Sequence, residues 1–229
     1  MRVNKFFIST AVALASIAVL STPASALTNL LGNPGFQTPL VSGAVLETPG
    51  ANLGACGKAA PYAGDDVHCW RVGGLGTYVV HNDFKIGAKA VKPAAGTQMV
   101  WLSGGTVLDP NGFPRYFPGE VHQTVKVTPG TNHPLQLSYA TMPFSPMGTS
   151  ALHVRVYACT ADANACVTAT DTVLSSNSTG NPQNMGWKTF STIIPVNVDM
   201  SLIVVDLSNN LPTIAMSSGD VAIDKFVLN

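Results

Sequence analysis

The chain has 229 residues, of which 46% are hydrophobic and 10% charged, and its formal net charge at pH 7 is 0. A balanced charge with no basic stripe argues against nucleic acid as a partner. The length is that of a single domain with a substantial core.

The first 26 residues have the pattern of a secretory signal peptide. Arg2 and Lys5 form a basic start, residues 8–20 an apolar run, and Ala24-Ser25-Ala26 a small-residue cleavage site. The apolar run is shorter than the roughly 20 residues that span a bilayer, which argues against a retained anchor. We therefore predict a signal peptide at 1–26 and a single domain at 27–229, secreted to the extracellular space or the periplasm and not inserted in a membrane.

Short strand-like runs fill the rest of the chain, and no stretch has a convincing helical period. In the run 120–128, Val121 and Val125 alternate with His122 and Thr124, which is typical of a strand with one buried face. About ten such runs at these intervals predict an all-β jelly-roll β-sandwich. The runs are 70–72, 77–80, 97–103, 120–128, 135–142, 151–158, 167–174, 187–194, 201–207 and 221–228.

Four segments between the runs read as loops. Residues 40–66 and 104–119 are rich in glycine and proline, and 175–184 are polar. Residues 83–95 carry three lysines among alanines and glycines, for which we favour a solvated loop over a helix.

The four cysteines form two local pairs, Cys56 with Cys69 and Cys159 with Cys166. In an oxidising compartment such pairs usually close, so we predict two disulfides. The alternative, a four-cysteine metal site, lacks the close spacing of a zinc knuckle.

Five motifs in order resemble the galactose-binding-like jelly rolls, especially the secreted bacterial choice-of-anchor C domains and related plant cell-wall proteins of uncharacterised function. The motifs are NLLGNPGF, GTQMVWLSGG, GEVHQTVKVTPGTNHPLQLSYA, MGWKTFS and GDVAIDKFVLN. The resemblance implies recognition of a polysaccharide or cell-surface glycan without catalysis.

The same resemblance implies a structural calcium ion. Many of these jelly rolls hold it with a glutamate after the first Asn-x-x-Phe and an aspartate in the last strand, and here those positions are Gln37 and Asp224. Loss of one carboxylate weakens a site built from oxygen ligands. Asp224 is thus the one candidate metal ligand, and whether the chain binds calcium stays an open question.

Glycan binding needs aromatic rings that stack on sugars and a few convergent polar groups. The loop residues Arg115, Tyr116 and Phe117 form one candidate site, since loops expose aromatic side chains. A second is the outward face of 151–158, with His153, Arg155 and Tyr157. Four further aromatic residues are weaker candidates: Trp70, Tyr78, Trp101 and Trp187.

Some candidates also have a plainer interpretation. Trp101 and Trp187 lie in strand patterns where an aromatic residue more often belongs to the core. His122 and His153 are more often solvated surface residues than ligand contacts.

Two other classes of function stay open. The chain could be a structural matrix or adhesion protein that binds another protein, and an exposed apolar patch would favour this. It could also be a glycan hydrolase that uses the cluster Asp65, Asp66 and His68, although no signature links its carboxylates. We predict that it is not an enzyme.

Overall fold

A computed structural model describes residues 29–37, 40–53, 70–144, 149–211, 214–217 and 219–229. The expected signal peptide, the pair Cys56 and Cys69, and the cluster Asp65, Asp66 and His68 lie outside these residues. The described residues contain no helix, and among them no helical segment is long and apolar enough to cross a membrane.

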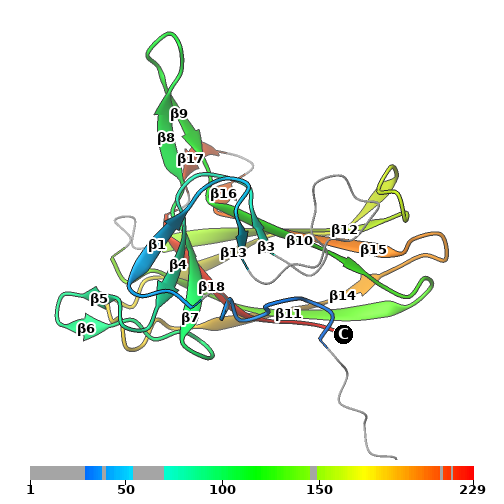
Figure 1. Ribbon diagram of the computed structural model, residues 1–229, viewed down its shortest axis with the longest axis horizontal. Helices are drawn as coiled ribbons and strands as arrows, with labels where there is room; N and C mark the ends of the chain where they lie inside the picture. Colours follow the sequence, from blue (N-terminus) through cyan, green and yellow to red (C-terminus); the bar gives the residue numbers. More distant parts are fainter. Residues whose placement is uncertain (1–28, 38–39, 54–69, 145–148, 212–213, 218) are drawn as a thin grey trace, which may run out of the picture.

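Two antiparallel six-stranded sheets, which we call sheet A and sheet B, form a sandwich (Figure 1). Sheet A has the order β1 (Ala44–Glu47), β4 (Thr77–His81), β7 (Gln98–Leu102), β18 (Val221–Leu228), β11 (Asn132–Thr141), β14 (Lys188–Pro195). Sheet B has the order β13 (Cys166–Asn177), β12 (Thr149–Cys159), β15 (Leu202–Ser208), β10 (Glu120–Lys126), β3 (Trp70–Val72), β2 (Asn52–Leu53).

The chain crosses repeatedly between the two sheets. It passes from β10 in sheet B to β11 in sheet A and back to β12, then from β13 through β14 to β15, and ends in β18 of sheet A. This order confirms the all-β jelly-roll β-sandwich.

Alternation along the strands builds the core between the sheets. On β12, Leu152, Val154 and Val156 are fully buried while the residues between them face outward. Trp70 is also fully buried, with its ring 4.7 Å from that of Phe226. Trp70 is therefore a core residue and is not available to stack on a sugar.

A second apolar layer covers the outer face of sheet A. The hairpin of β5 (Lys85–Ile86) and β6 (Lys89–Ala90) and the loop 183–187 pack against it. We call this layer the outer cluster of sheet A, and its buried members are Val80, Val91, Met99, Ala140, Met142, Met185 and Ala222.

Three expected loops contain strands. Residues 40–66 include β1 and β2, and 83–95 include β5 and β6. Residues 104–119 form a hairpin of β8 (Gly105–Leu108) and β9 (Pro114–Phe117) that stands away from the sandwich (Figure 1). These strands are only two to four residues long, so although Leu53 of β2 is buried in the core, their sequences are too short to show the alternation that marks a core strand. A further small pair, β16 (Asn210–Leu211) with β17 (Ile214–Ser217), completes the fold.

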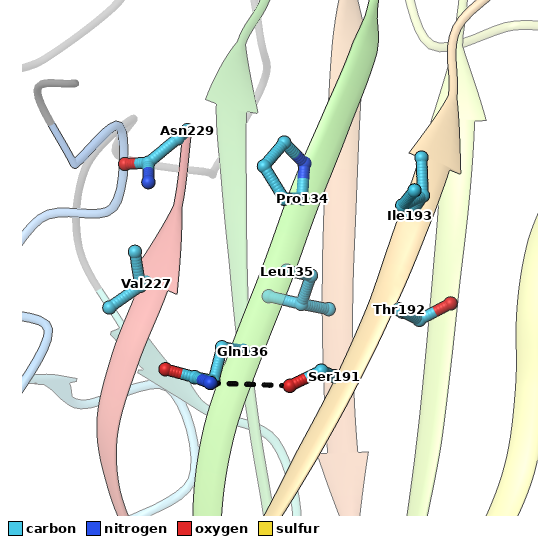
Figure 2. A pocket seen from close by; sticks show the side chains of 8 residues that line it. All are labelled: Pro134, Leu135, Gln136, Ser191, Thr192, Ile193, Val227 and Asn229. Atoms are coloured by element: carbon cyan, nitrogen blue, oxygen red, sulfur yellow. Dashed lines mark hydrogen bonds between the residues drawn. The ribbon is translucent and has the colours of Figure 1, made fainter. Parts of the chain in front are cut away.

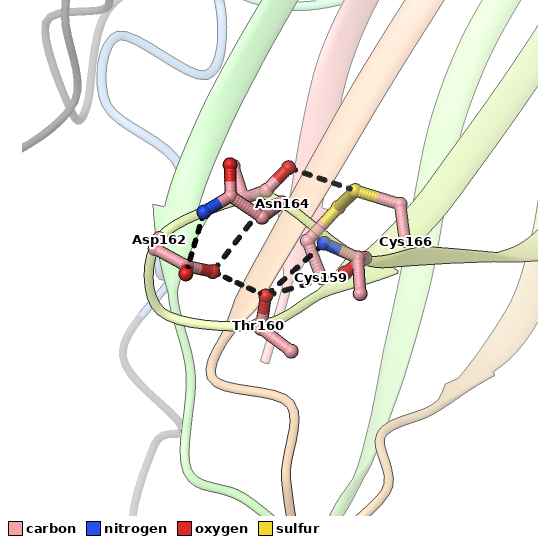
Figure 3. The surroundings of a disulfide bond; sticks show 7 residues. Cys159, Thr160, Asp162, Asn164 and Cys166 are labelled. Atoms are coloured by element: carbon pink, nitrogen blue, oxygen red, sulfur yellow. Dashed lines mark hydrogen bonds between the residues drawn. A yellow bond between two sulfur atoms is a disulfide. The ribbon is translucent and has the colours of Figure 1, made fainter.

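The hairpin of β12 and β13 ends in the predicted disulfide between Cys159 and Cys166, whose Cα atoms are 4.1 Å apart. Figure 3 shows the turn that the bond closes, in which the Thr160 hydroxyl donates to Asp162 Oδ1 at 2.6 Å. This disulfide is confirmed. The other pair stays a prediction.

The strand β18 lies between β7 and β11, at the centre of sheet A. An N-terminal segment runs along it: Leu30 N donates to Leu228 O at 2.7 Å, and Phe226 N donates to Pro34 O at 2.8 Å. The first described residues are thus tied to the last strand.

Candidate functional site

The outer face of sheet B carries a row of charged side chains that crosses five strands. Strand pairing places Asp171 of β13 opposite Arg155 of β12, and Arg155 opposite Asp206 of β15. Asp206 in turn faces His122 of β10, which faces Arg71 of β3. We call these five residues the polar row.

Ion pairs join the polar row to its neighbours. Arg155 Nη2 lies 2.5 Å from Asp206 Oδ2, and His153 Nε2 lies 2.6 Å from Asp171 Oδ1. His122 Nδ1 lies 3.9 Å from an oxygen of Glu120, at the start of β10. Acidic and basic side chains therefore alternate from Asp171 through Arg155 to Asp206, and two basic residues, His122 and Arg71, follow.

Three polar atoms at the centre of this face lack a partner. Arg155 Nε, Asp206 Oδ1 and the Ser208 hydroxyl oxygen are buried and make no hydrogen bond within the described part of the chain. Asp206 and Ser208 are two residues apart on β15, and Arg155 is the cross-strand neighbour of Asp206. One donor, one acceptor and one hydroxyl, all unpaired, thus lie side by side.

Burial changes the titration of the two central carboxyl groups. It raises the pKa of Asp206, although the positive charge of Arg155 acts in the opposite direction. Burial also raises the pKa of Glu120, and the negative charge of Asp206 adds to the rise. The two groups hold a proton to a higher pH than exposed carboxyl groups do.

The predicted residues of β12 belong to this face. As expected, His153, Arg155 and Tyr157 project to the same side, opposite the core residues of the strand. Tyr157 is half-buried and supplies an aromatic ring beside the polar row. His153, however, is only 5% exposed, so the interpretation of a plain solvated histidine is wrong: its hydrogen bond with Asp171 offsets the cost of burial.

The other predicted site falls on the β8–β9 hairpin, where its three residues do not share one face. Tyr116 turns back to the sandwich, and its hydroxyl lies 3.2 Å from Ser103 O and 3.3 Å from Asn209 Oδ1. Phe117 is 43% exposed, and Arg115 pairs with Asp109 at 3.3 Å. Because neighbouring strand residues point to opposite sides, the three do not form one flat surface.

Tyr78 and Trp101 are cross-strand neighbours on the outer face of sheet A. Their rings stack with centroids 4.4 Å apart, so each covers one face of the other. Trp101 Nε1 also donates to Asp220 Oδ1 at 3.0 Å. Both are half-buried parts of the packing around the outer cluster of sheet A, as is Trp187.

A shallow groove of about 370 Å³ lies further along the same face, over β18, β11 and β14 (Figure 2). Gln136 and Ser191 form its floor, where Gln136 Nε2 donates to the Ser191 hydroxyl at 3.2 Å. Ile193, 63% exposed, forms one wall. The groove lining contains no aromatic ring and no charged side chain.

The positions expected to hold calcium come together. A Cβ atom added at Gly35 would lie 3.5 Å from Gln37 Nε2 and 3.7 Å from Asp224 Oδ1, so the two side chains are neighbours. Asp224 is fully buried and accepts hydrogen bonds from Ala95 N at 2.8 Å and Lys225 N at 2.7 Å.

The orientation of the Gln37 amide does not suit a cation. Thr97 N–H can only donate, and it lies 2.8 Å from Gln37 Oε1. The other amide atom is therefore the NH₂ group, which donates to Gly35 O and to Gln98 O. These two carbonyl oxygens already accept hydrogen bonds from the NH₂ group, so they are not free to coordinate a calcium ion at this position.

No family model and no curated protein matches the chain. Among similar solved structures is TmCBM61 in complex with β-1,4-galactotriose, with 19% identity over 88% of this chain and 98% of that chain and a TM-score of 0.43. A CBM4 structure has 9% identity over 87% and 98%, with a TM-score of 0.44. The CBM22-1 xylan-binding domain from Paenibacillus barcinonensis Xyn10C has 10% identity over 82% and 96%, with a TM-score of 0.42. The fold assignment rests on the strand order of this chain.

Proposed function

We propose that the chain is a secreted, non-catalytic glycan-binding domain and that its binding face is the outer face of sheet B. The observation that carries this proposal is the group of three unpaired polar atoms on Arg155, Asp206 and Ser208. A buried polar atom without a partner costs about 1–3 kcal/mol, and native structures rarely keep several together without a use.

A sugar ring supplies what these atoms need. Neighbouring hydroxyl groups on a pyranose both donate and accept, so one pair can bond the Arg155 N–H and the Asp206 oxygen together. The Arg155 side chain is 32% exposed, which leaves room for it to move aside as a ligand enters. Tyr157, two residues further along β12, offers a ring for the apolar side of the sugar.

The experiment is retention of the purified chain on a panel of immobilised neutral and acidic polysaccharides. Asp206→Asn keeps the shape of the side chain but replaces one acceptor oxygen with a donor, and Tyr157→Ala removes the ring. We expect Asp206→Asn to weaken binding of the retained glycan about 10- to 100-fold, the range that one hydrogen bond to a charged group is worth. Tyr157→Ala should weaken it about 2- to 10-fold, as the loss of one aromatic contact does. Circular dichroism checks that both variants fold.

Phe113→Ala is the matched control, because it removes an aromatic ring that is 66% exposed on the β8–β9 hairpin, away from the polar row. It should bind as the unchanged chain does. Loss of binding in this variant alone would move the site to the hairpin. No retention on any glycan would contradict the proposal.

A second candidate function is adhesion to a protein, and the β8–β9 hairpin favours it. Its large apolar side chains are unusually open to solvent: Val107 48%, Leu108 67%, Phe113 66% and Phe117 43% exposed. Exposed apolar groups gathered on one projection are typical of a contact surface. A protein partner that is lost with Leu108→Ser, while glycan retention persists, would support this candidate.

A further inference from the structure

A pocket lies on the opposite side of the sandwich from the polar row, on the outer face of sheet A. It is a pocket of about 270 Å³ between residues 92–94, residues 183–187 and the strands β11 and β18. Its polar and aromatic lining consists of Lys92, Ser138, Gln183, Asn184, Trp187 and Lys225. We call it the two-lysine pocket.

Hydrogen bonds between its two loops hold the pocket in shape. Lys92 N donates to Pro182 O at 3.0 Å, and Trp187 Nε1 donates back to Lys92 O at 3.0 Å. Gln183 Nε2 also donates to Ala90 O. Three links between segments about 90 residues apart in the chain fix the indole and the Gln183 amide before any ligand arrives, and such preorganisation lowers the cost of binding.

A β-bulge places Lys225 at the pocket. The pairing of β11 with β18 shifts between Gln136 and Ser138, and Lys225 has a φ of 53°. This left-handed conformation is uncommon for a residue other than glycine, and bulges often redirect a side chain near a binding site. The bulge adds a second lysine to a pocket that already has Lys92.

The charges in the pocket are of one sign. Its lining includes two ammonium groups and no carboxylate, and neither lysine forms an ion pair in the part of the chain that the structure describes. Asp224, next to Lys225 in the chain, is fully buried and is not part of the lining. The Ser138 hydroxyl and the two amides of the lining can bond uncharged hydroxyl groups.

We propose that the two-lysine pocket binds a uronate, a sugar that carries a carboxylate, within an acidic polysaccharide. The two ammonium groups match the carboxylate, the amides and Ser138 match the ring hydroxyls, and Trp187 supplies an apolar contact. This site lies on the opposite face from the polar row and does not depend on it.

The test is calorimetric titration with trigalacturonate and, in parallel, with an uncharged galactose trisaccharide. Lys92→Gln and Lys225→Asn each remove one ammonium group, and asparagine tolerates a left-handed backbone. We expect each to weaken trigalacturonate binding about tenfold at low salt, as the loss of one charge-assisted hydrogen bond does. Raising the salt concentration should weaken binding by the unchanged chain.

Lys89→Gln is the control, because it removes an equal charge from an exposed residue of β6 outside the pocket. Its affinity should stay within twofold of the unchanged chain. If Lys92→Gln and Lys225→Asn bind trigalacturonate as tightly as the unchanged chain does, the proposal is wrong. If acetate competes with trigalacturonate at an equal concentration, the pocket recognises a carboxylate and not a sugar. Asp206→Asn should leave trigalacturonate binding by this pocket unchanged. The test of this pocket is therefore independent of the test of the polar row on sheet B.

Discussion

The two outer faces of the sandwich differ although both sheets obey the same period of two. The outer face of sheet A buries Met99, Met142 and Ala222 under loops, so sheet A is apolar on both sides over β7 and β18. The outer face of sheet B instead carries the polar row. The cover over β7 and β18 stabilises sheet A, and the two-lysine pocket lies elsewhere on that face, beside β11 and the bulge of β18. On sheet B the polar row crosses five strands of the outer face.

The difference between the two faces is visible in the sequence patterns of their strands. On β7 the run Gln98–Leu102 has no exposed residue, as expected for a strand with cover on both faces. On β12, outward His153, Arg155 and Tyr157 alternate with the buried core residues. Consecutive apolar residues thus mark sheet A, which is covered on both sides, and strict alternation marks sheet B, which carries the polar row.

The largest expected effect is on the covered face. Met99→Ala empties a fully buried position in the outer cluster of sheet A and should lower the free energy of unfolding by about 3 kcal/mol. Ile193→Ala, on the same face but 63% exposed, should change it by less than about 0.5 kcal/mol. Urea denaturation measures both. A loss below about 1 kcal/mol for Met99→Ala would mean that the second apolar layer contributes little.

On the polar face, Arg155→Ala should lower the free energy of unfolding by about 2 kcal/mol at pH 7, because it leaves the Asp206 carboxylate without its cation. The pKa of Asp206 is already raised by burial and rises further without Arg155. Below that pKa the carboxyl is neutral, so the loss should shrink toward pH 4. Arg115→Ala removes an arginine that is 69% exposed, and its partner Asp109 keeps the hydrogen bonds from Asn111 N and Phe113 N, so the change should cost little at either pH. A loss that does not vary with pH would contradict this account of the pair.

A third effect concerns the pH dependence of stability and comes from Asp224, a buried acidic residue of sheet A. Burial raises the pKa of Asp224 from 3.8 to about 7, so between these values the folded chain binds more protons than the unfolded chain. The free energy of unfolding should therefore fall as pH rises through this window, by at most about 1.4 kcal/mol per pH unit for one proton. Asp224→Asn should flatten the slope, measured by urea denaturation at several pH values. An unchanged slope would show that other groups cause it.

The smallest expected effect concerns calcium. Because the Gln37 NH₂ group already takes up Gly35 O and Gln98 O, a chelator should leave the melting temperature unchanged. Gln37→Glu should lower it, since a carboxylate would face carbonyl oxygens, and millimolar calcium should restore part of the loss. If a chelator lowers the melting temperature of the unchanged chain by several degrees, the chain binds the calcium ion that the resemblance implies.

The core strands could be predicted from the sequence because burial on one face leaves a period of two. The run 221–228 coincides with β18, and 120–128 differs from β10 only at its end. The hairpin of β8 and β9 could not be predicted, because Pro114 and Pro118 argue against a strand and its side chains bury little.

The candidate site could be predicted only in part. Arg155 and Tyr157 follow from alternation along one strand, but Asp206 is about 50 residues away in sequence and becomes their neighbour through the pairing of β12 with β15. The same holds for the two-lysine pocket, whose lysines come from a loop and from a bulge in the last strand. Register and bulges depend on the whole sheet, so no local pattern reports them.

The central position of β18 has a consequence for how the molecule is made. The strand β18 joins β7 to β11, and without it sheet A would be two separate ribbons, β1-β4-β7 and β11-β14. The pairings β1-β4, β4-β7 and β11-β14 can form without β18, but the two ribbons join through this strand, so the closure of sheet A waits for a contact between segments far apart in the sequence.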